Sequence, residues 1–122
     1  MKNKSLVSSF YHAFCGIFRS LTVERNMFIH FMIMLIVILC GLILNISLIE
    51  WLVCIIVFGN VLALELVNTA LETTVDICSP NISEKAKTAK DTAAGAVLIM
   101  VLVSIVAGLI IFLPKIINFI NK

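Results

Sequence analysis

The stretch IEWLVCIIVFGNVLALELVNTALETTV, residues 49–75, decides the fold of this chain. It is long enough to cross a lipid bilayer as a helix, because about 20 mainly apolar residues span the hydrocarbon core. Yet its second half carries Glu65, Asn68 and Glu72, and Asp76 follows it directly. The stretch therefore predicts a membrane-spanning helix with a stripe of polar side chains toward one end.

The whole chain shares this apolar character. Hydrophobic residues make up 61% of its 122 residues, charged residues only 13%, and the mean hydropathy is +1.16. A soluble domain would carry about 25% charged residues. A closed barrel is excluded because the two-residue alternation of its strands is missing. We predict an all-α integral membrane protein with three transmembrane helices in a single domain over residues 1–122, with helices at about 29–48, 50–76 and 83–114.

An additional helix is predicted at about residues 6–25, ahead of the first span. Its apolar side chains recur at helical spacing: Leu6, Phe10, Phe14, Ile17, Phe18 and Leu21. This pattern is typical of an amphipathic helix that lies in the membrane interface. A cleaved signal peptide is the alternative, but Tyr11 and His12 interrupt its apolar part and no Ala-x-Ala-like cleavage site follows.

The basic residues predict the orientation in the membrane. Seven of the nine Lys and Arg residues fall on the same side of the predicted spans: Lys2, Lys4, Arg19, Arg25, Lys85, Lys87 and Lys90. The positive-inside rule makes that side cytoplasmic. We therefore expect a multi-pass protein of the cell (inner or plasma) membrane with a cytoplasmic N-terminus.

The polar stripe of residues 65–76 runs from the cytoplasmic interface into the membrane. Its four polar residues fall within about 80° on a helical wheel. We place Trp51 at the outer boundary of the membrane and use a rise of ~1.5 Å per residue. Glu65 then lies ~21 Å and Glu72 ~31 Å from that outer boundary, so Glu72 is the nearer of the two to the cytoplasmic interface. A mid-membrane carboxylate costs roughly 2.5–3.5 kcal/mol, so Glu65 needs a partner, a proton or a task. A hydrogen-bond network that holds an oligomer together is one alternative.

Other charged residues are expected at the same membrane face. Lys90 and Asp91 lie at the membrane entrance of the third span, and Glu24 and His30 precede or begin the first. Carboxylates suit Mg²⁺ when phosphate oxygens complete its coordination shell, and a lysine side chain neutralises the charge of a phosphate. A deeper carboxylate such as Glu65 can accept a proton from a lipid hydroxyl. Phosphoryl transfer to a lipid is therefore chemically coherent, although the sequence has no P-loop and no protein-kinase signature.

The run ELVNTALETTVD at residues 65–76, followed by Lys90-Asp91, resembles the signature of the small prokaryotic diacylglycerol kinase/undecaprenol kinase family. The GIF run that begins at Gly16 also matches. The run ERNMFIH at residues 24–30 resembles the undecaprenol kinase branch more closely. The resemblance covers the chain from about residue 10 to residue 110.

The resemblance implies a homotrimer with active sites shared between subunits and with Mg-ATP as the phosphoryl donor. Glu65 would be the catalytic base, and Asn68 would orient Glu65 or the γ-phosphate. Glu24 and Glu72 would hold the magnesium that bridges the nucleotide phosphates. The residues implied in nucleotide binding are Glu24, Glu72, Asp76, Lys90 and Asp91, with Asn81 and Ser83 in the connector.

The resemblance is less direct at four other positions. His12, with Tyr11 beside it, falls where relatives carry a nucleotide-contacting aromatic residue. His30 and Ala94 are candidate contacts for the lipid substrate. Phe28 replaces the Arg or Lys of many relatives, which puts a basic contact there in doubt.

The function expected from this resemblance is ATP-dependent phosphorylation of a lipid alcohol at the cytoplasmic face, converting undecaprenol to undecaprenyl phosphate. Conversion of diacylglycerol to phosphatidic acid is the alternative within the same class. A proton- or ion-conducting oligomer is the alternative of a different class, but residues 52–64 offer only Asn60 as a polar relay. The expected partners are the membrane lipid, ATP and further copies of the chain, with no nucleic acid.

Overall fold

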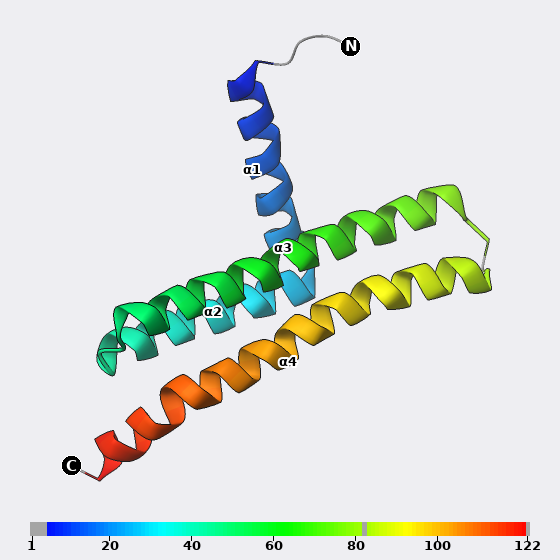
Figure 1. Ribbon diagram of the computed structural model, residues 1–122. Coiled ribbons are helices and arrows are strands. Elements are labelled where there is room, and N and C mark those ends of the chain that lie inside the picture. Colours follow the sequence, from blue (N-terminus) through cyan, green and yellow to red (C-terminus); the bar gives the residue numbers. More distant parts are fainter. Residues whose placement is uncertain (1–4, 82, 122) are drawn as a thin grey trace.

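The computed structural model describes residues 5–81 and 83–121. Within these ranges the chain forms four α-helices and no strand, which confirms the all-α class. The helices are α1 (Leu6–Val23), α2 (Arg25–Ile43), α3 (Leu48–Cys78) and α4 (Glu84–Ile120). In Figure 1, α1 points away from the other three helices, and α3 and α4 run antiparallel. Lys2 and Lys4, two of the seven basic residues on the predicted cytoplasmic side, lie outside the described residues.

The helices α2, α3 and α4 are each long and apolar enough to cross a membrane. Most of their large apolar side chains are exposed on the single chain, as they are throughout α1. Such surfaces are stable in contact with lipid or with other membrane helices, because lipid tails are as apolar as leucine. The chain is therefore a membrane protein with three spanning helices, as predicted.

The break between α1 and α2 falls on Glu24. This residue has an extended backbone, with φ −92° and ψ 117°, and its N–H donates to the carbonyl of Ser20 at 2.9 Å. The helix α2 therefore begins at Arg25, four residues before the start expected at residue 29. One non-helical residue is enough to turn α1 out of the bundle, and it places Glu24 at the corner where α1 and α2 meet.

The turn between α2 and α3 is tight and capped. Asn45 has a φ of 49°, a left-handed conformation that asparagine tolerates better than most residues. Ser47 then starts α3 with a capping box: its Oγ accepts from the Glu50 N–H at 3.3 Å, and Glu50 Oε2 accepts from the Ser47 N–H at 2.7 Å. These local interactions end α2 at Ile43, whereas apolar character alone extended the expected helix to residue 48.

A close approach of α2 to α3 depends on Gly41. A Cβ atom built at Gly41 would lie 2.7 Å from Trp51 Cη2 and 2.9 Å from Trp51 Cζ2. Nearby, Ile46, Cys54 and Ile111 form a buried apolar cluster that joins the turn to α3 and α4. The indole of Trp51 therefore packs where only a glycine leaves room for it.

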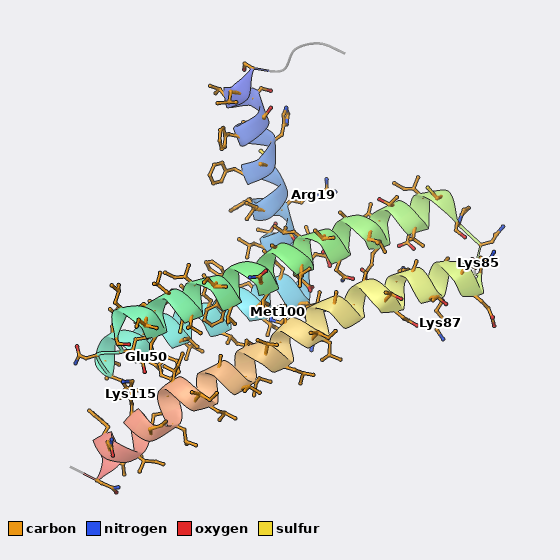
Figure 2. The ribbon with its side chains drawn as sticks, viewed as in Figure 1. Arg19, Glu50, Lys85, Lys87, Met100 and Lys115 are labelled. Atoms are coloured by element: carbon orange, nitrogen blue, oxygen red, sulfur yellow. The ribbon has the colours of Figure 1, made fainter. Side chains whose placement is uncertain are left out.

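The antiparallel pair of α3 and α4 forms the most extensive contact between helices. An ion pair closes it at each end: Lys115 Nζ lies 3.2 Å from Glu50 Oε2, and Lys90 Nζ lies 2.9 Å from Asp76 Oδ1. Figure 2 shows Glu50 and Lys115 together at one end of the helix pair. The two ion pairs show the register in which α4 lies along α3.

The helix α4 continues past the point at which the sequence predicted its end. It begins after Ser83, whose side chain accepts from the Ala86 N–H at 3.1 Å, and it runs through Pro114 to Ile120. Proline lacks an N–H, but spanning helices tolerate it because neighbouring helices and local adjustments satisfy the freed carbonyl. The helix therefore extends six residues past the predicted end at residue 114.

Candidate active site

The inner part of the polar stripe of α3, Glu65 and Asn68, is buried within the single chain. Glu65 is 3% exposed and Asn68 is 7% exposed, although both sit on a helix whose other faces carry exposed apolar side chains. A carboxylate or an amide in such a place is costly unless it is paired or has a function. These two residues are the polar side chains of α3 that the fold covers most completely.

Asn68 connects the buried part of the stripe to its outer part. Its Nδ2 donates to Glu72 Oε1 at 3.4 Å, one helical turn further along α3. Its Oδ1 is enclosed and has no hydrogen-bond partner within residues 5–81 and 83–121. An enclosed acceptor without a donor costs about 1–3 kcal/mol. Asn68 is therefore ready to accept a hydrogen bond from a group that the single chain does not supply.

The corner before α2 and the start of α2 contribute groups that act electrostatically on Glu65. His30, Glu72 and Glu24 act electrostatically on the Glu65 carboxylate, and the Asn26 side chain approaches it. His30 and Glu24 are half-buried. The corner at Glu24 thus directs the beginning of α2 toward the polar stripe of α3. The structure brings Glu24, His30, Glu65 and Glu72 into one region, and Asn26 is a member that the sequence did not indicate.

A second group of predicted residues gathers where α3 joins α4. A cavity of about 340 Å³ is lined there by five of the residues implied in nucleotide binding: Asp76, Asn81, Ser83, Lys90 and Asp91. The ion pair between Lys90 and Asp76 forms one wall of it. This group lies one helical turn beyond Glu72 along α3, so the two groups are consecutive along one polar track.

A larger groove opens between α1 and α3. It has a volume of about 520 Å³, and its polar lining comprises Arg19, Ser20, Glu24, Thr69 and Thr73. Glu24 was predicted as a site residue, whereas Arg19 and Ser20 were not. Helical spacing could have indicated both, because Gly16, Arg19, Ser20 and Val23 recur at intervals of three or four residues.

Two predicted contacts, His12 and Ala94, stay outside these groups in the single chain. His12 is exposed on α1, with its ring centroid 5.6 Å from that of Tyr11. The pKa of Tyr11 is raised, first by a hydrogen bond with the Cys15 side chain. Ala94 and Phe28 are exposed. Only His12 and Ala94 belong to the implied site, and neither lines the cavities that contain Glu24 or Lys90.

The carboxylates fit a magnesium ion that is shared with phosphates better than one that is enclosed by protein. Among the described residues, no group of three or more His, Cys, Asp or Glu side chains gathers closely enough to hold a metal ion. Mg²⁺ needs only one or two protein carboxylates when phosphate and water oxygens complete its octahedral shell. Glu24 and Glu72, which both act electrostatically on Glu65, are the candidates for that smaller requirement.

Three spanning helices and a buried polar track define an integral membrane protein with a candidate active site toward one membrane face. The chain belongs to the prokaryotic diacylglycerol kinase family, whose sequence model matches residues 11–112. It is 43% identical over 107 residues to the undecaprenol kinase of Bacillus subtilis, covering 88% of this chain and 87% of that relative. It is 35% identical over 115 residues to a diacylglycerol kinase of Synechocystis sp., covering 93% of this chain and 66% of that relative. The family expected from the sequence is thereby confirmed.

Proposed function

We propose that this protein is a Mg-ATP-dependent lipid kinase that phosphorylates undecaprenol at the cytoplasmic face of the membrane. The observation that carries the proposal is the buried carboxylate of Glu65 in a spanning helix, one turn from Asn68 and two from Glu72. Membership of the family and 43% identity to an undecaprenol kinase support the reaction and the substrate.

In this proposal Glu65 is the catalytic base. Its carboxylate accepts the proton of the lipid hydroxyl, and the lipid oxygen attacks the γ-phosphorus of ATP. The bond between that phosphorus and the β,γ-bridging oxygen breaks, and ADP leaves with the electron pair. Asn68 orients Glu65 or the γ-phosphate, and its enclosed Oδ1 provides an acceptor for that purpose. Burial of Glu65 excludes water, which limits wasteful transfer of the phosphoryl group to water.

Glu24 and Glu72 are the residues that would hold magnesium. When bound, the ion neutralises charge that develops on the phosphate oxygens. The chain supplies this pair from two elements, Glu24 from the α1–α2 corner and Glu72 from α3. A shift of either element would therefore change the separation of the two carboxylates.

The cavity at the α3–α4 connector is proposed to hold the nucleotide. Lys90 provides a cation for phosphate, while Asp76 and Asp91 position Lys90 and the nucleotide polar groups. Asn81 and Ser83 add polar groups from the connector. His12 is proposed to reach the nucleotide from α1, and His30 and Ala94 to contact the lipid.

The orientation and the assembly are also part of the proposal. The basic residues Arg19, Arg25, Lys85 and Lys87 support a cytoplasmic location for α1 and for the α3–α4 connector. Exposed Leu6, Phe10 and Phe14 suit an α1 that lies in the membrane interface. A homotrimer with shared sites would give His12 and Ala94 neighbours that the single chain lacks.

Diacylglycerol remains the second candidate substrate, because a diacylglycerol kinase is 35% identical to this chain. Purified protein in bicelles should be supplied with γ-labelled ATP, Mg²⁺ and either undecaprenol or diacylglycerol. We expect label in the lipid fraction, with the higher kcat/KM for undecaprenol. A higher kcat/KM for diacylglycerol would reverse the substrate assignment.

The same experiment tests the class of protein. Absence of transfer to either lipid alcohol, from protein shown to be folded and to bind ADP, would contradict the kinase proposal. Proton or ion flux through reconstituted vesicles would then favour the conducting oligomer. The matched blank for each assay is the Glu65→Gln variant, which keeps the size of the side chain and removes its charge.

A further inference from the structure

The groove between α1 and α3 contains a cation that the proposed catalytic residues do not use. Arg19 lines this groove and is exposed, and no carboxylate of the described residues lies within 4.0 Å of its guanidinium to form an ion pair. By contrast, Lys90 and Lys115 each pair with a carboxylate. Figure 2 shows Arg19 projecting from the part of α1 that approaches α3. Arg19 is thus available to an anion that enters the groove.

Ser20, next to Arg19, is a second and independent indication of a ligand. It lines the same groove and is only 6% exposed, and its Oγ is enclosed, with no hydrogen-bond partner in the described part of the chain. A buried hydroxyl without a partner costs free energy, whereas most buried polar groups are paired. Rotation about χ1 to another staggered position redirects this hydroxyl with no movement of the backbone. A ligand oxygen in the groove would give it the missing partner.

The other lining residues suit a small anionic group. Thr69 and Thr73 add hydroxyl groups from α3, and the groove volume of about 520 Å³ is within the range of ligand pockets. Gly16 leaves one wall open, since a Cβ atom there would meet nothing within 4 Å. Glu24 also lines the groove, so an anion bound there would lie next to a proposed magnesium ligand. A phosphate group, which arginine binds through a fork of N–H donors, matches this combination.

We propose that the α1–α3 groove is a phosphate-binding subsite in which Arg19 and Ser20 donate hydrogen bonds to a phosphate group. The inference rests on the proposed function, because that reaction supplies two phosphate groups that could enter: one of the soluble nucleotide and one of the phosphorylated lipid product. Both sources share the chemistry that Arg19 recognises. The groove lies between α1 and α3, whereas the cavity with Lys90 lies between α3 and α4, so Arg19 adds a cation on the α1 side of α3.

Binding of each source to Arg19 variants tests the subsite. The probes are ADP, measured by equilibrium dialysis against protein in detergent micelles, and undecaprenyl phosphate, measured by its inhibition of lipid phosphorylation. Arg19→Gln should weaken one of these interactions roughly tenfold, the effect of losing one charge-assisted hydrogen bond. Arg19→Lys should recover most of it. Lys85→Gln removes a charge from exposed α4 outside both cavities, and it should leave both interactions unchanged.

The outcomes identify the source of the phosphate. Weaker ADP binding with unchanged product inhibition assigns the subsite to the nucleotide, and the reverse result assigns it to the lipid phosphate. Unchanged binding of both probes to Arg19→Gln, at an unfolding midpoint equal to that of the wild type, overturns the proposal. An equal loss in Lys85→Gln would also overturn it, because the effect would then reflect general charge and not a site.

Ser20→Ala provides a second test that does not depend on charge. If the hydroxyl contacts no ligand, its removal should raise the unfolding midpoint, because an unpaired buried hydroxyl is lost, and it should leave binding unchanged. If it contacts the phosphate, the affinity for the probe that Arg19 affects should fall. The subsite and the kinase proposal fail separately: ADP binding that depends on Arg19 in a protein without lipid kinase activity would support the subsite alone.

Discussion

Lys90 Nζ lies 2.9 Å from Asp76 Oδ1, so an ion pair joins the start of α4 to the end of α3 across the connector between them. The pair also forms a wall of the cavity proposed for the nucleotide. An interaction that stabilised the fold and an interaction that served binding would look alike in this position. They differ in what happens when the pair is broken.

We expect Lys90→Gln to impair nucleotide binding much more than stability. The two side chains are 35% and 66% exposed, and exposed ion pairs contribute little to stability because water screens them. Thermal unfolding midpoints of Lys90→Gln, Asp76→Asn and the double variant should therefore lie close to that of the wild type. The KM for ATP should rise at least tenfold in Lys90→Gln. A large fall in the midpoint with an unchanged KM would show that the pair is structural.

Glu65→Gln should lower kcat by roughly 10²–10⁴-fold, the usual contribution of a general base. The affinity for ADP should stay the same, because Glu65 faces the lipid hydroxyl in the proposed mechanism and not the nucleotide. The measurement is single-turnover transfer of label together with equilibrium dialysis. Glu84→Gln, an exposed carboxylate in the first turn of α4, is the matched control and should keep the wild-type rate. Wild-type turnover by Glu65→Gln would remove Glu65 from the role of base.

Glu72→Gln should raise the Mg²⁺ concentration needed for half-maximal rate. The amide oxygen of glutamine can still accept the hydrogen bond from Asn68 Nδ2, so the local fold should be retained. What is lost is the negative charge, and hard cations such as Mg²⁺ prefer carboxylate oxygen. A magnesium titration of the initial rate checks this. A titration curve identical to that of the wild type would mean that Glu72 does not hold the metal.

Gly41→Ala should destabilise the protein by about 1–3 kcal/mol, because overpacking forces side chains or backbone to move. The added Cβ would meet two atoms of the rigid Trp51 ring at 2.7 and 2.9 Å. The measurement is the unfolding midpoint in detergent. Gly59→Ala in α3 is the control, since its Cβ would meet nothing within 4 Å. Combining Gly41→Ala with Trp51→Leu should recover part of the loss, and failure to do so would locate the strain elsewhere.

The sequence predicted the features that arise from local composition. Apolar length predicted three spanning helices, and helical spacing placed Glu65, Asn68 and Glu72 on one face, where the structure buries the first two. Specific contacts between distant side chains were not accessible in this way. The ion pair of Glu50 with Lys115 depends on how α3 and α4 align, and no periodicity in either segment encodes that alignment.

Errors at the helix ends have a similar origin. The end of α2 at Ile43 follows from the left-handed Asn45 and the Ser47 capping box. Both features give a weaker signal in the sequence than the surrounding apolar run. Arg19 was assigned only to the charge asymmetry because its partner surface, the face of Thr69 and Thr73, lies on another helix. The assembly of several chains stays a prediction, since it concerns surfaces that one chain leaves exposed.

The lengths of the two longest helices connect the site to the membrane around it. α3 has 31 residues and α4 has 37, which correspond to ~46 Å and ~56 Å of helix, against ~30 Å of hydrocarbon. The excess must project into water or be absorbed by tilt, a case of hydrophobic mismatch. Because Glu65 is fixed on α3, its distance from the lipid headgroups changes with bilayer thickness. The rate at which a lipid hydroxyl meets Glu65 should therefore vary with the acyl-chain length of the host membrane.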